Sequence, residues 1–383
     1  MLSTMTITSS TGTAAEPTAE RADTAAVGAS AQPDGSARQH QVNDFFELNR
    51  RVKEAGLLER GAKSYIPRAI VLTLAFAGAG TLLALLGSSP WQLLVAALFG
   101  ILFTQAAFLS HDAAHQQVFA NGRRNEWLAR LVGNGVVGLS YAWWAKKHGK
   151  HHANPNTIGK DGDIEPGIIA FVPDDAQQRN GLAGWFVRRQ GWMLFPLLLF
   201  FGLSLHVHAI DAVARAKKVK QRKAEAALLA VRLIAFPALV IWAAGLWMGL
   251  GFLAVQLAVF GVYMGASFAP NHKGMPIIPK DTKVDFLQRQ VLTSRNIRGG
   301  RLIDWTMGGL NFQVEHHIFP RMPSPNLHKV KPIVEEFCAE REIPYTETGL
   351  VESYVIVTRY LNRVGLGYSD PMECPIIAQY RPR

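Results

Sequence analysis

Two long segments of the chain, 69–110 and 233–271, contain no charged residue. A membrane-spanning helix needs about 20 apolar residues, so each segment is long enough for two spans. Each segment also has glycine-rich turn chemistry near its middle, at 87–90 and around 245–251. We therefore predict an all-α integral membrane protein with four transmembrane helices in two hairpins, at about 69–87, 91–110, 229–247 and 249–269.

Two other apolar segments are harder to place. Segment 131–145 is short and is interrupted by Gly133, Asn134 and Gly135, which favours a position in the interface or inside the protein. Segment 190–210 is long enough to cross the membrane, but a crossing would put the basic linker 215–223 on the side opposite the cytoplasm. We therefore expect segment 190–210 to dip into the membrane or to lie flat on it.

The ends of the chain are more polar than its middle. Residues 1–40 are rich in Ala, Ser and Thr and lack an apolar core, which predicts a disordered tail rather than a secretory signal. Residues 41–345 then form the membrane domain, with interfacial helices and a cytoplasmic cap, and residues 346–383 form a C-terminal cytoplasmic tail. In the cap, apolar residues recur at helical spacing at positions Leu327, Val330, Val334, Phe337 and Cys338.

Charge and cysteine content narrow the possibilities. The net charge is +11, but the basic residues flank the apolar segments, as at Lys63, Arg68 and 217–223. This distribution follows the positive-inside bias of cytoplasmic loops, and anionic lipid headgroups explain it better than nucleic acid, which we exclude as a partner. Cys338 and Cys374 are the only cysteines, too few for a disulfide framework or a cysteine-based metal site.

Histidine is concentrated in three short clusters. Residues spaced i, i+3 or i, i+4 share one face of a helix, and neutral imidazole is a strong ligand for Zn, Fe, Cu and Ni. Because the predicted topology puts all three clusters on the cytoplasmic side, we predict one shared metal centre there. Its ligands are His111 and His115, then His148, His151 and His152, then His316 and His317.

Seven histidines exceed the three or four ligands of one zinc site, so two metals fit better. His272, directly after the last span, is a candidate eighth ligand or a headgroup contact, and Gln313 ligates or only donates a hydrogen bond. We interpret the other histidines, His40, His206, His208 and His328, as structural. Carboxylates near the clusters are candidates to orient the rings, or are solvated: Asp112, Asp161, Asp163, Asp304 and Glu315.

The motifs HDAAH (111–115), HGKHH (148–152) and QVEHH (313–317), in this order, resemble the three histidine boxes of membrane fatty acid desaturases. The segments HHANPNTIGKDGD and SRNIRGG are similar to that family too. The glutamine that opens the third box resembles the front-end and linoleoyl-type acyl desaturase branch. The resemblance covers about residues 65–345.

This resemblance implies a non-haem diiron enzyme that uses O2 and two electrons to make a double bond in a fatty acyl chain, carried on coenzyme A or lipid. The seven box histidines would be the iron ligands, His272 a further ligand, and Asn271 a neighbour that holds water. The sequence lacks the His-Pro-Gly-Gly motif of a fused haem domain. Electrons are therefore expected from a separate ferredoxin or similar carrier, which docks on the basic cytoplasmic face.

Alternatives remain at this stage. Trp143 and Trp144 line an acyl tunnel or belong to an aromatic belt at the membrane interface. An acyl or carotenoid hydroxylase or other oxygenase would need the same iron site. A membrane zinc hydrolase is disfavoured by the number of histidines and by the lack of an HExxH motif, and a metal transporter by the lack of ionisable residues in the two long segments.

Overall fold

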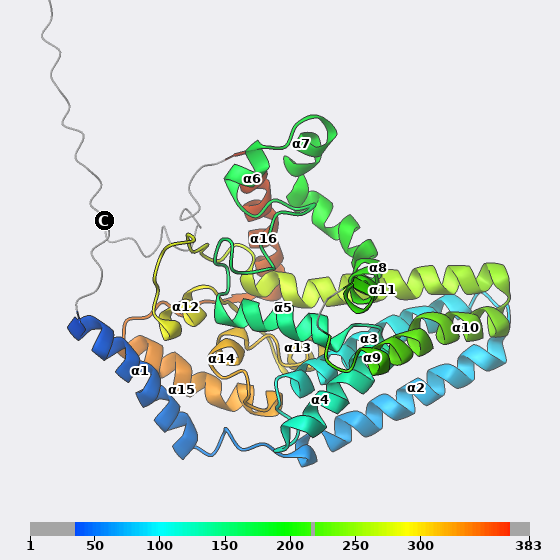
Figure 1. Ribbon diagram of the computed structural model, residues 1–383, viewed down its shortest axis with the longest axis horizontal. Coiled ribbons are helices and arrows are strands. Elements are labelled where there is room, and N and C mark those ends of the chain that lie inside the picture. The colour runs from blue at the N-terminus through cyan, green and yellow to red at the C-terminus, as the bar shows by residue number, and fades with distance from the viewer. Residues whose placement is uncertain (1–34, 216–218, 368–383) are drawn as a thin grey trace, which may run out of the picture.

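The computed structural model describes residues 35–215 and 219–367, and the side chains from residue 44 onward within these ranges. It is mostly helical (Figure 1). Within the described ranges, five helical stretches are long and apolar enough to cross a membrane, judged by length and composition: Ala62–Leu86, Gln92–Ala114, Gln190–Arg215, Arg222–Ala244 and Leu246–His272. They contain η1 (Ala62–Ser64), α2 (Ile66–Leu86), α3 (Gln92–Ala114), α8 (Gln190–Arg215), α9 (Arg222–Ala230), the π-helical η3 (Val231–Ala235), α10 (Phe236–Ala244) and α11 (Leu246–His272).

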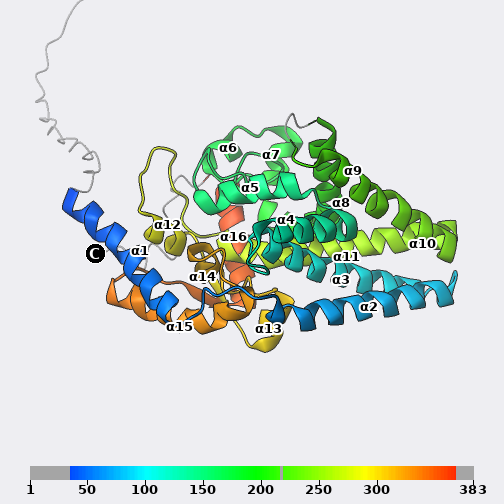
Figure 2. The ribbon, with the colours of Figure 1, turned by 60° about the horizontal axis from the view of Figure 1, so that its bottom comes forward.

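Helices α2, α3, α10 and α11 run side by side (Figures 1 and 2). The four segments predicted as spans lie largely within α2, within α3, within the continuous stretch of α9, η3 and α10, and within α11. Their two hairpin turns lie where the glycines predicted them, and Gly87 and Gly245 adopt positive φ angles of 52° and 79°. The bundle core is mostly aliphatic but contains a cluster of aromatic rings, in which Phe99, Phe103, Phe236 and Phe252 pack on one another. The helical hairpins therefore follow directly from hydropathy and turn chemistry.

Arg232 is a charged residue inside the predicted span 229–247, and it turns inward. Its side chain is buried and lies over the ring of Phe103, with the guanidinium carbon 4.1 Å from the ring centroid. Its Nη2 donates to Oε1 of Gln256 at 3.1 Å. Intramembrane charges are costly in lipid, so an inward position with polar and aromatic contacts is the expected solution.

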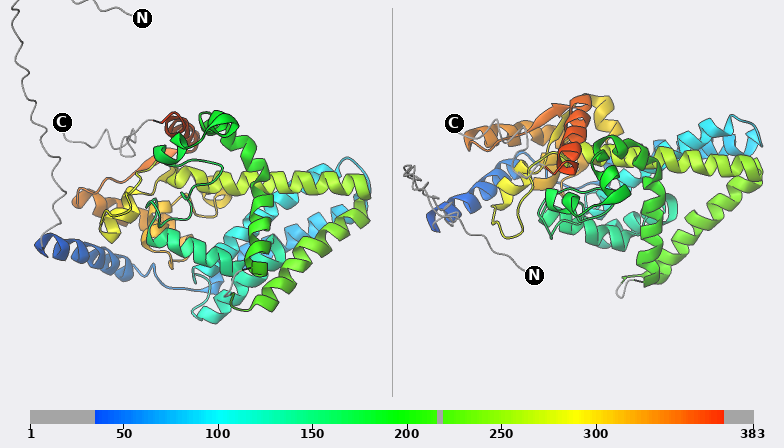
Figure 3. Two further views of the ribbon diagram at one scale, coloured as in Figure 1. Left: turned by 45° about the horizontal axis from the view of Figure 1, so that its top comes forward. Right: turned by 90° about the horizontal axis from the view of Figure 1, so that it is seen from above.

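Helix α8, which contains the segment expected to dip into the membrane or lie flat, crosses α11 instead of running along it (Figure 3). The backbones approach closely at small residues: a Cβ on Gly202 would lie 2.7 Å from the carbonyl oxygen of Leu257. Away from this crossing α8 exposes large apolar side chains such as Trp192 and Phe200. Its transverse direction is consistent with a helix outside the bundle, and the four-span topology stays a prediction.

The part of the chain beyond the bundle packs around a second apolar core. Here the helical face predicted over residues 327–338 is confirmed, because its five apolar residues are all buried. Arg51 of the first helix pairs with Glu340 at 2.8 Å and so joins the two ends of this region. The elements are α1 (Gly35–Glu54), α12 (Phe286–Leu292), β1 (Asn296–Arg298), α13 (Arg301–Thr306), α14 (Gln313–Ile318), η4 (Ser324–Asn326) and α15 (Leu327–Glu340).

Both segments predicted as tails contain helical residues in the described part of the chain. Helix α1 begins at Gly35, inside the segment 1–40, and the rest of that segment lies outside the described residues. At the other end, β2 (Glu347–Gly349) pairs in parallel with β1, and α16 (Leu350–Gly365) buries an apolar face. Residues 347–365 are therefore a folded element rather than a tail, because α16 is amphipathic; residues 368–383 lie outside the described part.

Helix α16 packs on α8 and on two short helices, α6 (Pro173–Gln177) and α7 (Gly181–Val187). The side chain of Gln190 at the start of α8 donates to the carbonyl of Leu361 at 2.9 Å. Along the chain between α3 and α6 come α4 (Gly122–Arg130), the π-helical η2 (Leu131–Val137) and α5 (Tyr141–Ala153). As expected for segment 131–145, no candidate span contains η2 or α5.

Candidate metal centre

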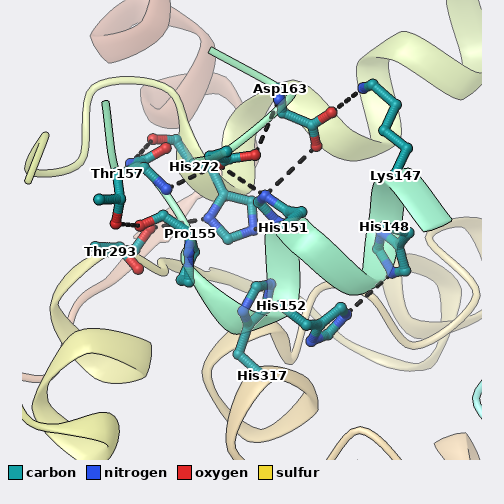
Figure 4. Close-up of polar contacts among 12 residues, drawn as sticks. Lys147, His148, His151, His152, Pro155, Thr157, Asp163, His272, Thr293 and His317 are labelled. Carbon is teal, nitrogen blue, oxygen red and sulfur yellow. Dashed lines mark hydrogen bonds and ion pairs between the residues drawn. The ribbon is translucent and has the colours of Figure 1, made fainter. Parts of the chain in front are cut away.

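The predicted histidines converge at the end of α3 and α11 that lies away from the two hairpin turns. Box one comes from the end of α3, box two from α5, box three from α14, and His272 is the last residue of α11. Figure 4 shows box two facing His272 and His317 across a short gap. Four elements that are distant in sequence therefore meet at one point.

The first group consists of His111, His115, His148 and His316, whose ligand nitrogens lie within 4.8 Å of one another. Three of these rings, all except His148, have a buried Nε2 without a hydrogen-bond partner among the described residues. A buried nitrogen without a partner is costly, so several of them facing one point fit a cation better than an empty space.

The second group consists of His151, His272 and His317, again with ligand nitrogens within 4.8 Å of one another. Nε2 of His151 lies 3.2 Å from Nε2 of His272, and Nε2 of His317 has no partner among the described residues. This group likewise presents three imidazole nitrogens to one point.

His152 connects the two groups. Its ring stacks on His317 with 4.3 Å between centroids, and its Nε2 lies 3.0 Å from Nε2 of His148 (Figure 4). All histidines predicted as ligands are therefore brought together, and they divide into two sets that share a boundary.

Hydrogen bonds at Nδ1 orient the rings. His151 donates to Asp161 at 2.9 Å, His272 donates to the carbonyl of Thr293 at 2.9 Å, and Nδ1 of His111 lies 3.2 Å from Oδ1 of Asp112. A proton held on Nδ1 leaves the Nε2 lone pair free for a metal. Asp112 and Asp161 thus lie where the sequence suggested.

The rings are also held in the neutral form that metal ligation requires. Burial is the main cause, and it lowers the pKa of five rings well below the ordinary value of 6.5, with the neighbouring rings adding to the effect. These are His115, His148, His152, His316 and His317.

Two other predicted neighbours lie beside the second group. Gln313 places Nε2 2.8 Å from Nε2 of His272, and its Oε1 accepts a hydrogen bond from Asn271 at 3.0 Å. Asp163 lies 3.5 Å from Nδ1 of His151 and pairs with Lys147 (Figure 4).

Glu315 and Asp304 have other partners. Glu315 accepts hydrogen bonds from Tyr345 at 2.7 Å and Asn296 at 2.8 Å, so it anchors α14 to the strand region instead of orienting a ring. Asp304 accepts from Asn311 at 2.8 Å. Proximity in sequence was misleading for both carboxylates. Glu315 points to another face of α14 than the adjacent His316, and Asp304 is on a different helix, α13.

Trp143 and Trp144 have different surroundings. Trp144 stacks on His148 at 4.3 Å and lines a small cavity of about 30 Å³ that reaches His111. The ring of Trp143 instead packs against His208 in a tilted arrangement, with 5.5 Å between centroids, and does not line the cavity. The rest of the wall is mostly apolar and comes from α3, η2, α5 and α11.

The four histidines interpreted as structural contribute to neither group as far as the structure describes them. His206 bonds to the carbonyl of Val137 at 3.1 Å, His208 bonds to that of Ser204, and His328 is exposed. The side chain of His40 lies outside the described residues.

Sequence reasoning missed Gln290 of α12. It is fully buried, its Oε1 accepts from Nδ1 of His317 at 3.0 Å, and its Nε2 donates to the carbonyl of His152 at 3.0 Å. A signal was present, because Gln290 lies on the same helical face as the buried Leu287 and Val291, and a buried polar residue needs a partner.

Comparisons with known proteins agree with this geometry. A family model described as "Fatty acid desaturase" matches residues 88–349, which include all three histidine clusters and His272. The Delta(5) fatty acid desaturase fat-4 of Caenorhabditis elegans is 30% identical over 333 residues, covering 80% of this chain and 71% of that protein. The Delta(6)-fatty-acid desaturase fat-3 of the same organism is 28% identical, with 84% and 75% covered. The acyl-lipid (9-3)-desaturase of Physcomitrium patens is also 28% identical, with 84% and 63% covered.

Proposed function

Because the chain belongs to the fatty acid desaturase family, we propose that its converging histidines hold two iron ions with which it desaturates a fatty acyl chain. The chain is a membrane oxidoreductase of lipid metabolism. The proposal of two metals is supported by two separate groups of histidine nitrogens, four of which are buried without a partner among the described residues. Iron and O2 together supply the strong oxidant that an unactivated methylene group requires, which no side chain can supply.

We assign one iron to each of the two groups of histidine rings. His111, His115, His148 and His316 would hold one iron, and His151, His272 and His317 the other, with His152 at the boundary between them. We assign His272 as a ligand because its Nδ1 bonds to Thr293 while its Nε2 faces His151.

Gln313 lies beside the second group, with its Nε2 2.8 Å from Nε2 of His272. With Nε2 of His272 bound to a metal, the amide nitrogen of Gln313 could no longer donate to it. Half a turn of that amide would point Oε1 to the same place, so Gln313 is proposed as an oxygen ligand or as a close neighbour of the second metal.

The acyl chain is proposed to approach through the cavity beside His111 and Trp144. Its largely apolar wall suits a hydrocarbon chain and excludes water. A volume of about 30 Å³ holds roughly one water molecule, so the wall must open to admit a chain.

The electron donor and the side of the membrane on which the metal centre lies are also parts of the proposal. We propose an external carrier such as a ferredoxin, which would meet the exposed Lys146 and Lys150 on α5, the helix that carries the second box. The basic residues beside the spans favour a cytoplasmic position for the metal centre. Four spans with α8 outside the bundle would keep all ligands on this side.

Elemental analysis of the detergent-purified full chain tests the metal centre. We expect about two irons per chain, a sharp loss of iron in His316→Ala, and no loss in the matched control His208→Ala, whose ring is exposed and outside both groups. One zinc per chain, unaffected by His316→Ala, would contradict the proposal. Fatty acids fed to cells that express the protein then report whether the product is unsaturated or hydroxylated.

A further inference from the structure

A second cleft, of about 300 Å³, opens between the start of α2 and the region of α13 and η4. Its polar lining is mostly basic: Arg68 and Arg301 reach it, together with the exposed His328. Asp304 is the acidic side chain in the wall, and one of its oxygens is already bonded to Asn311. The two guanidinium groups therefore outnumber the carboxylate.

The guanidinium group of Arg68 makes only long contacts with its hydrogen-bond and ion-pair partners. Its Nη2 donates to the carbonyl of Gln105 at 3.3 Å, and its Nη1 lies 3.6 Å from Asp112. Both distances exceed the 2.7–2.9 Å usual for charge-assisted hydrogen bonds, and its buried Nε has no partner among the described residues. Arg301 is exposed and has no carboxylate partner in the described part of the chain. Both groups can accept an anion without losing a strong bond.

The surface around the cleft is apolar. Ile66 and Ile70 at the start of α2 are 51% and 53% exposed, and Leu302 and Trp305 of α13 are 71% and 53% exposed. Apolar and aromatic side chains next to arginine, at the end of a candidate span, are typical of the level at which lipid headgroups meet hydrocarbon.

The cleft is also next to the metal centre. Gly308, in the cleft wall, packs directly against Phe108, which lines the cavity beside His111. Asp112, the neighbour of Arg68, is hydrogen-bonded to the ring of His111. A molecule whose head lies in the cleft therefore has its first chain carbons within one side chain of the catalytic cavity.

We propose that this cleft binds the phosphate of the acyl carrier, so that Arg68 and Arg301 hold the head of the substrate while its chain enters the cavity. This inference rests on the proposed desaturase function and deepens it by naming the carrier's chemistry, a phosphate ester. A phospholipid and coenzyme A both have such a group, and the experiment separates them.

Binding is measured by native mass spectrometry of the detergent-purified full chain, independently of iron and turnover. The probes are dioleoylphosphatidylglycerol, dioleoylglycerol, which has the same chains without phosphate, and coenzyme A. We expect the phosphatidylglycerol Kd to rise about tenfold in Arg68→Gln and in Arg301→Gln. The matched control is Arg123→Gln, an exposed arginine in a different surface cleft beside Trp127, and it should bind like the native chain.

The outcomes are distinct. If coenzyme A competes with phosphatidylglycerol for the native chain, and this competition is lost in Arg68→Gln and Arg301→Gln, the acyl carrier is coenzyme A. If phosphatidylglycerol binds and coenzyme A does not compete, the carrier is a phospholipid. Equal binding of phosphatidylglycerol and dioleoylglycerol, or native affinity in both variants, overturns the proposal. Arg301→Gln keeps the test usable if Arg68→Gln fails to fold. It should also raise KM for the acyl carrier with iron content and kcat unchanged, which separates a failed cleft from a failed desaturase.

Discussion

Nδ1 of His317 lies 3.0 Å from Oε1 of Gln290, a residue 27 positions away in sequence. The amide nitrogen of this glutamine donates to the carbonyl of His152, so one side chain of α12 connects the second and third histidine clusters. Because the glutamine oxygen accepts, the His317 proton is held on Nδ1 and the Nε2 lone pair faces the second group.

The first prediction follows from this contact. Gln290→Leu should weaken iron binding by about 10- to 100-fold, as loss of a hydrogen bond to a ligand generally does, whereas Gln290→Glu keeps an acceptor for His317 and should weaken it less. Iron titration of the metal-free protein measures both. Gln288→Leu is the control, because Gln288 is on the same helix and its side chain has no hydrogen bond among the described residues. Equal iron affinity in Gln290→Leu and Gln288→Leu would refute this role.

The two aspartates near His151 should differ in importance. Asp161 is fully buried and accepts from His151 at 2.9 Å and from the backbone of Asn156 at 2.8 Å, whereas the Asp163 side chain is 35% exposed. We expect Asp161→Ala to lose iron and to destabilise the fold by about 1–3 kcal/mol, because it leaves buried donors unpaired. Asp163→Ala should have the smaller effect on both. Iron content and thermal unfolding midpoints compare the two, and the reverse order would contradict the assignment.

The tryptophans offer a test of the acyl cavity. Trp144→Ala removes the ring that stacks on His148 and lines the cavity, so product yield should fall about tenfold or the product distribution should change. Trp143→Ala removes a ring that contacts His208 outside the cavity and should leave yield within about twofold. Gas chromatography of cellular fatty acids measures both variants. Similar losses in the two would place the acyl chain elsewhere.

Acid should destabilise the metal-free protein. The pKa values of five buried rings, among them His115 and His316, lie below the ordinary 6.5 in the folded chain. Below about pH 6.5 the unfolded chain therefore takes up protons that the folded chain does not, and the free energy of unfolding falls as pH decreases. Above that pH these rings are neutral in both states and add no pH dependence. Unfolding midpoints in detergent between pH 5 and 8 check this, and equal midpoints at pH 5 and 7 would contradict it.

We expect helix α16 to contribute to the free energy of unfolding, which a C-terminal tail would not do. The side chain of Leu361 in this helix is buried, so Leu361→Ala should cost about 2–5 kcal/mol. Leu366→Ala is the matched control, because Leu366 is 57% exposed at the end of the same helix. A thermal unfolding series measures both, and equal midpoints in the two variants would mean that α16 contributes little to the fold.

Local patterns in the sequence were enough to locate the bundle helices and to name the candidate metal ligands. Hydropathy depends only on neighbouring residues, so it located α2, α3, α10 and α11, and glycines located the turns at Gly87 and Gly245. Spacing of three or four residues put the histidines of each box on one helix face before any packing was known.

Only the tertiary structure decided how these parts meet. His148 and His151 are neighbours on α5 yet belong to different groups, because their rings face histidines from different helices. Gln290 and Thr293 become partners of the ligands, and Glu315 does not, through the relative positions of α12, α11 and α14. The sequence by itself thus determined what each helix presents, since helical periodicity is local. The division into two groups, the cleft beside Arg68 and the packing of α16 depend on contacts between distant segments, which no local pattern contains.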